Sequence, residues 1–159
     1  MSRLRARVRH LGHLARRFAG SLSSRAPGVA DEGWAESQLL PSEVELWRRM
    51  PNQDRRHAIA VARRFEAARA SAATRAEMAG ALLHDVGKAD AGLGTFGRVV
   101  ATVTPPQWRR DRSQRYHRHE AIGADWCRRA GSDPVTVLLV AGEGAPPELL
   151  AALRAADEL

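Results

Sequence analysis

Apolar residues recur three or four positions apart along much of the chain, which is the spacing of one face of an α-helix. Between residues 52 and 65 this pattern predicts an amphipathic helix that carries His57 on its apolar stripe. A second stripe, from residue 149 to residue 156, has Asp157 beside it. The two stripes consist of Ala58, Val61, Ala62 and Phe65, and of Leu149, Leu150, Leu153 and Ala156.

Start signals place further helices between these two. Residues 74–77 (Thr-Arg-Ala-Glu) have the capping-box pattern and open an apolar run that ends at Leu83. Residues 42–45 (Ser-Glu-Val-Glu) have the same pattern and predict a helix start at Ser42. An Asp-Pro pair precedes the run 135–140, which we interpret as a short buried helix because no other segment offers a strand partner.

The rest of the pattern is weaker. It predicts a helix over 95–104, a charged loop over 109–115 and a helix over 117–129. Because strand signals are scarce throughout, we expect an all-α fold, a compact helical bundle.

The beginning of the sequence differs from the remainder. Residues 1–20 combine arginines with apolar residues at helical spacing, which predicts a basic amphipathic helix, and residues 20–33 have the composition of a flexible linker. We therefore divide the chain into residues 1–40 and a domain over 41–159. Packing of the basic helix on the domain is the favoured interpretation, and peripheral contact with an anionic membrane surface is the alternative.

The chain is strongly basic, with a net charge of +7 over 159 residues. Lys88 is its sole lysine, so arginine carries nearly all of the positive charge. This charge favours anionic partners such as phosphate-bearing ligands. Nucleic acid is disfavoured as the main partner, because aromatic residues are not interleaved with the arginines as stacking platforms require.

The segment His84-Asp85-Val86-Gly87-Lys88 follows the apolar run of the helix that opens at 74–77. His and Asp are costly to bury without partners, but they are good ligands for a divalent metal. Gly87 permits the helix to end there, and Lys88 places a cation beside the candidate metal ligands. The segment therefore indicates a metal site that handles phosphate.

With His57 before this pair and Asp157 after it, the chain resembles the HD-domain superfamily of metal-dependent phosphohydrolases over about residues 42–159. The resemblance implies an all-helical HD domain in which His57, His84, Asp85 and Asp157 hold a metal. Members with a second metal have further histidines, including a His-His pair; here residues 140–147 contain no histidine. The resemblance therefore implies one divalent ion, with Mn²⁺, Fe²⁺, Co²⁺ or Ni²⁺ favoured and Mg²⁺ or Zn²⁺ also compatible.

The resemblance also assigns roles in catalysis. Asp85 orients or deprotonates the attacking water, and Lys88 assists by neutralising charge on the phosphate. The substrate-binding candidates are Lys88, Arg112, Arg115 and His119.

These observations predict a cytoplasmic enzyme that hydrolyses a phosphorylated small molecule, most simply a nucleotide. The alternative is an HD domain that has lost catalysis and acts as a metal- or nucleotide-binding regulatory module. Cys127 is the one cysteine, which we interpret as a buried small side chain and not as a nucleophile. The pattern leaves the substrate and the oligomeric state open.

Overall fold

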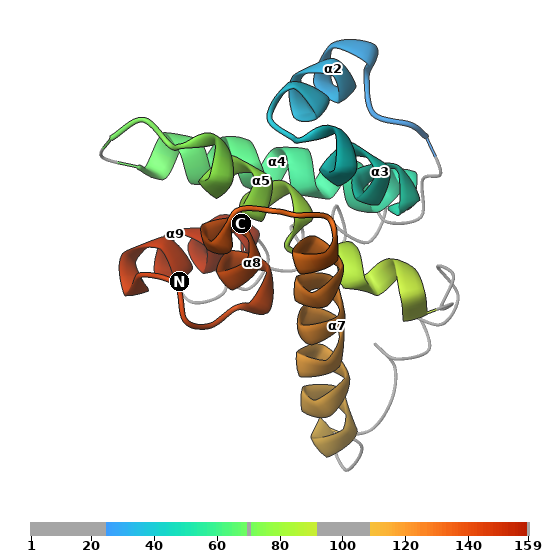
Figure 1. Ribbon diagram of the computed structural model, residues 1–159, viewed down its shortest axis with the longest axis vertical. Coiled ribbons are helices and arrows are strands. Elements are labelled where there is room, and N and C mark those ends of the chain that lie inside the picture. Colours follow the sequence, from blue (N-terminus) through green and yellow to red (C-terminus); the bar gives the residue numbers. More distant parts are fainter. Residues whose placement is uncertain (1–24, 70, 92–108, 159) are drawn as a thin grey trace, which may run out of the picture.

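The computed structural model describes residues 25–69, 71–91 and 109–158, with the backbone alone described for residues 90, 91 and 109–118. Every regular element in these ranges is a helix, as the sequence pattern predicts (Figure 1). The elements are α2 (Val29–Ser37), α3 (Pro41–Arg49), α4 (Asn52–Ala68), α5 (Arg75–Leu83), the 3₁₀-helix η1 (Val86–Ala91), α7 (Arg109–Arg129), α8 (Pro134–Ala141) and α9 (Pro147–Glu158).

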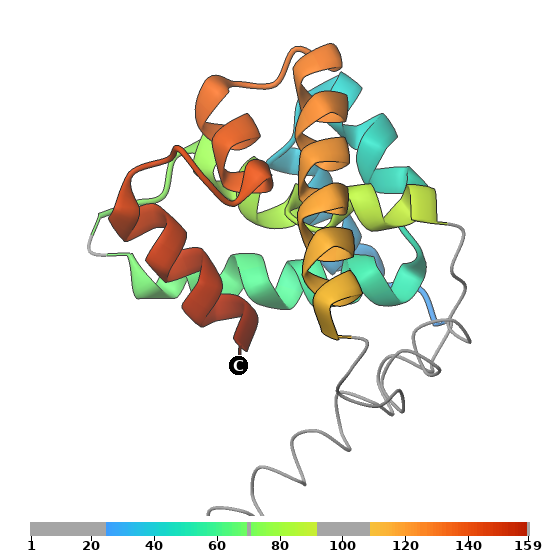
Figure 2. The same ribbon diagram turned by 90° about the horizontal axis from the view of Figure 1, so that it is seen from below.

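Helix α5 lies at the centre of the bundle. It packs against α4 on one side and α8 on the other, while α7 covers both α8 and η1. Helix α9 runs along α4, as Figure 2 shows at the lower left of that view. The carboxyl end of α5, where the His-Asp pair stands, is therefore surrounded by α4, α7 and α9.

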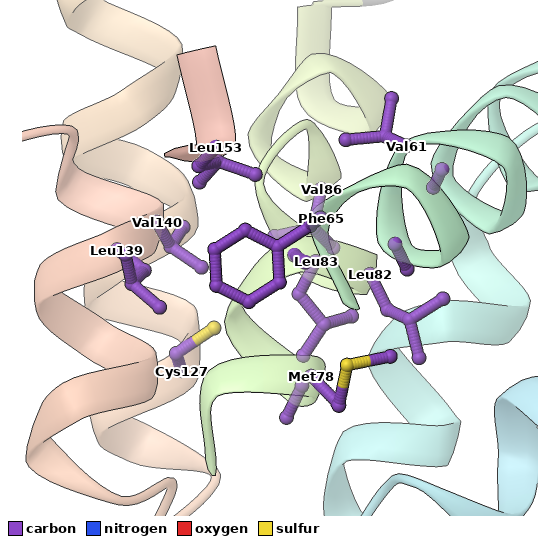
Figure 3. Packing of buried hydrophobic residues seen from close by; sticks show 14 of the residues in the cluster. Val61, Phe65, Met78, Leu82, Leu83, Val86, Cys127, Leu139, Val140 and Leu153 are labelled. Atoms are coloured by element: carbon purple, nitrogen blue, oxygen red, sulfur yellow. The ribbon is translucent and has the colours of Figure 1, made fainter. Parts of the chain in front are cut away.

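The core that holds these helices is built of medium-sized apolar side chains. Phe65 of α4 is fully buried at its middle, with Leu83 of α5, Cys127 of α7 and Val140 of α8 around it (Figure 3). Full burial of a large apolar side chain contributes about 1.5–3 kcal/mol. The stripe predicted for residues 52–65 is thus the buried face of α4, which carries Ala58, Val61, Ala62 and Phe65.

Two predicted helix starts are confirmed. Thr74 Oγ1 accepts a hydrogen bond from the amide of Glu77, and the Glu77 carboxylate accepts one from the amide of Thr74 at 2.8 Å. Asp133 accepts from the amide of Val135 at 2.8 Å and begins α8, the short buried helix expected there.

The predicted start at Ser42 is wrong. Helix α3 begins one residue earlier with Pro41, whose fixed φ suits the first helical position, so that Leu40 is the N-cap. Glu43 accepts from the amide of Leu40 at 2.7 Å. The Ser42 hydroxyl instead donates to the carbonyl of Ala130 at 2.7 Å and ties α3 to the end of α7.

Two other segments differ from their prediction. Residues 29–33, expected within the linker, form the first part of α2, and Glu32 there accepts hydrogen bonds from Trp47 Nε1 and from the Arg55 guanidinium. Residues 109–115, expected as a charged loop, are the first turns of α7. Arginine is a good helix former, so a helix packed at its carboxyl end extends into this charged segment.

The predicted helices over 1–20 and 95–104 lie outside the described residues. Within the described part, no helix is long and apolar enough to cross a membrane.

Gly87 sets the distance between η1 and α7. A Cβ atom at this position would lie 2.0 Å from the carbonyl oxygen of His119 and 2.8 Å from the amide of Gly123. Substitution Gly87→Ala is therefore expected to lower the free energy of unfolding by about 1–3 kcal/mol or more, measured by urea denaturation.

Gly33 is the matched control, because it is an exposed helical glycine with open space at its Cβ position. Gly33→Ala should raise the stability by about 0.5–1 kcal/mol through helix propensity alone. Equal effects of the two substitutions would show that the contact between η1 and α7 is not tight.

Candidate metal centre

Three helices bring together side chains that are far apart in the sequence. His57 comes from the second turn of α4, His84 is the residue that ends α5, and Asp157 lies in the last turn of α9. One ligand atom from each lies within 4.8 Å of the others, so the three could hold one ion. We call this set the His57–His84–Asp157 trio.

Asp157 lies close to both histidines of the trio. Asp157 Oδ1 lies 2.7 Å from His57 Nε2 and 3.8 Å from His84 Nε2. A metal with bonds of about 2.0–2.2 Å to nitrogen and oxygen places its ligand atoms roughly 3–4 Å apart. In the metal-free site the short contact is a hydrogen bond in which His57 donates to the carboxylate.

His84 is oriented by the helix that carries it. Its Nδ1 lies 2.9 Å from the carbonyl oxygen of Ala81, so this nitrogen carries a proton and donates. Its Nε2 is buried and has no hydrogen-bond partner. Metal-binding histidines commonly donate one ring N–H to a backbone carbonyl and direct the other nitrogen to the metal. The orientation of His84 is therefore compatible with a role as a metal ligand.

Asp85 lies next to the trio but outside it. Its Oδ2 is 3.5 Å from His84 Nε2 and accepts a hydrogen bond from Lys88 Nζ at 2.6 Å. The Asp85 side chain is buried. Its Oδ2 atom therefore lies between His84 and Lys88. Asp85 is placed to join the coordination of an ion held by the trio or to act beside it.

Neighbouring charges act against burial on the titratable groups of the site. Burial lowers the pKa of His84, but the negative charges of Asp85 and Asp157 outweigh it and the net pKa is raised. Burial likewise raises the pKa of Asp85, and the charges of His84 and Lys88 reverse this, so that the net pKa is lowered. The hydrogen bond from His57 holds the pKa of Asp157 far below its usual range. A cation that binds must displace protons from the histidines.

A pocket of about 810 Å³ opens beside the trio. His84, Asp85 and Asp157 line one part of it, and His119 of α7, a predicted substrate contact, lines it as well. Lys88 is not among the lining residues. Its position behind Asp85 makes it a partner of that carboxylate, whereas the sequence predicted that it contacts the substrate phosphate.

Sequence reasoning missed several charged residues of this pocket. They are Glu120 and Arg128 of α7, Glu143 after α8, and Arg154 and Glu158 of α9. A signal existed for Arg154, which stands three residues before Asp157 and hence on the same helix face. Arg154 donates to the carbonyl of Gly142 at 3.0 Å, so its guanidinium is held near the pocket.

The two other predicted substrate contacts, Arg112 and Arg115, lie in the part of α7 for which the backbone alone is described. Their roles stay predictions.

Comparisons of the chain with protein-family models, with curated proteins and with solved structures return no match.

Cys127 is not part of the candidate site's chemistry. Its side chain is fully buried, and burial raises the pKa of the thiol to about 12. We expect the folded protein to react with a thiol reagent at pH 8 more than about a hundredfold more slowly than the urea-unfolded chain, because the thiolate is the reactive form. Labelling of the folded protein at the rate of a free thiol would contradict this burial.

Proposed function

We propose that the protein is a metal-dependent phosphohydrolase in which the His57–His84–Asp157 trio, joined by Asp85, holds one divalent ion. The observation that carries the proposal is His84 Nε2, which is buried without a hydrogen bond and faces His57 and Asp157 from two other helices. The carboxylates of Asp85 and Asp157 lie 3.5 and 3.8 Å from this nitrogen. The order of these residues in the sequence, which resembles that of HD-domain proteins, is the second support.

A buried nitrogen without a partner costs about 1–3 kcal/mol, so it calls for an explanation. A metal would supply one, since an ion that displaces the imidazole proton takes the Nε2 lone pair and lies beside the two carboxylates. Imidazole and carboxylate ligands together suit Mn²⁺, Fe²⁺, Co²⁺ or Ni²⁺, and they also accept Mg²⁺ or Zn²⁺.

When bound, the ion lowers the pKa of a water molecule and polarises a phosphoryl oxygen. Asp85 then orients the attacking water and accepts its proton, for which its position at the edge of the pocket is suitable. Lys88 holds the Asp85 carboxylate through the 2.6 Å hydrogen bond and keeps it ionised.

The pocket suits a substrate with an organic part as well as a phosphate. Leu150 and Leu153 of α9 and Val140 of α8 form apolar lining. Arg128 and Arg154 supply positive charge, and carboxylates line the pocket as well, namely Asp85, Glu120, Glu143, Asp157 and Glu158. A volume of about 810 Å³ lies within the range of small-molecule sites. We infer a phosphorylated small molecule, with a nucleotide as the first class to test.

The first test is metal content. Purified protein should carry about one equivalent of a divalent metal by elemental mass spectrometry. Asp157→Asn and His84→Ala should each lose most of it, because each removes one ligand from the trio. Asp31→Asn is the control. The Asp31 carboxylate is partly exposed and pairs with Arg63, and it is not one of the candidate ligands.

Equal metal content in all of these variants would rule out the site. Bound metal without hydrolysis of any phosphate ester would favour the alternative, a regulatory module that binds metal or nucleotide without turnover.

The second test concerns catalysis by Asp85. Asp85→Asn keeps the size of the side chain but removes the base, so hydrolysis of a generic phosphomonoester should fall by about 100-fold or more. Metal content should fall as well if the carboxylate is a ligand. Asp125→Asn, at an exposed residue paired with Arg129, is the control. Unchanged turnover in the Asp85 variant would remove this residue from the mechanism.

A further inference from the structure

Arg64 connects α4 to the last turn of α9. Its Nε donates a hydrogen bond of 2.7 Å to the carbonyl oxygen of Ala156. Ala156 is buried and directly precedes Asp157, the carboxylate of the trio. The contact therefore holds the backbone beside a candidate metal ligand.

Arg64 and His57 lie on the same face of α4. They are seven residues apart, which is about two helical turns. His57 Nε2 contacts the Asp157 side chain while Arg64 contacts the neighbouring carbonyl, so α4 makes two contacts with two consecutive residues of α9. One contact sets the position of the carboxylate and the other sets the position of the backbone that carries it.

The end of α9 needs such a contact. The last four carbonyl groups of a helix have no amide partner within that helix, and Ala156 is one of these residues in the described helix. A guanidinium at this end also interacts favourably with the helix dipole. Arg64 thus gives this carbonyl group a partner that the helix itself does not supply.

We propose that Arg64 is a positioning residue, which fixes the last turn of α9 on α4 and thereby holds Asp157 in the trio. The proposal rests on the proposed function in that the trio is taken to bind a metal. It adds a residue that is not among His57, His84, Asp85 and Asp157 and that would act on the metal site only through α9.

The test compares Arg64→Gln with Arg63→Gln. Arg63 is the adjacent residue on α4, but its exposed side chain pairs with Asp31 and lies over the Trp34 ring at 4.6 Å, away from α9. Both variants remove one charge from the same helix. If Arg64→Gln does not fold, Arg64→Met retains the apolar stem of the side chain and takes its place.

Three readouts are measured. Hydrogen exchange of the metal-free protein reports the protection of residues 154–158, and the ¹⁵N resonance of His57 Nε2 reports its hydrogen bond to Asp157. Titration with Mn²⁺ reports the affinity. For Arg64→Gln we expect lost protection in the last turn of α9, a shifted His57 resonance and about tenfold weaker Mn²⁺ binding, which corresponds to about 1.4 kcal/mol. Protection in α5 and α8, and all three readouts in Arg63→Gln, should stay unchanged.

The outcomes separate this inference from the proposed function. Unchanged protection and an unchanged His57 resonance in the Arg64 variant overturn the positioning role, as does a uniform loss of protection in all helices. Mn²⁺ affinity equal to that of the wild type overturns it also. If the wild type binds no Mn²⁺, the metal site fails, and hydrogen exchange with the His57 resonance then decides the role of Arg64 by itself.

Discussion

The close approach of η1 to α7 is the constraint on which the site depends. Gly87 lies against the backbone of His119 with no space for a Cβ atom, and Gly123 faces it from the next turn of α7. Because η1 begins directly after the His-Asp pair, this contact fixes where His84 and Asp85 lie relative to α7.

A second constraint acts through charge. Asp85 is nearly buried beside His84 and Lys88, and Asp157 is held by His57. Burying an unpaired charge would cost several kcal/mol, so each carboxylate has a cationic or hydrogen-bonding neighbour. The pairs keep the carboxylates ionised, which is the form that binds metals. Fold stability and the candidate chemistry thus depend on the same contacts.

The pattern of residues predicted much of this arrangement but not all of it. Helical spacing places His57 on the buried face of α4, and the helix after 74–77 carries His84 to its end. The role of Lys88 depends on how η1 turns, which no spacing rule gives. The positions of Arg64 and Arg128 could not be predicted. In a chain with 25 lysines and arginines, the sequence does not distinguish an arginine of the site from one that is solvated at the surface.

His84 Nε2 is buried without a hydrogen bond and faces the carboxylates of Asp85 and Asp157 at 3.5 and 3.8 Å. An apolar side chain at the end of α5 would fill this space without leaving a buried nitrogen unsatisfied. Elsewhere the residue types match their positions in the fold. Thr74 caps α5, and the apolar residues of α4 lie on its buried face. This buried histidine is consistent with the metal site proposed above, because a cation held by His57, His84 and Asp157 would satisfy the nitrogen that makes no hydrogen bond.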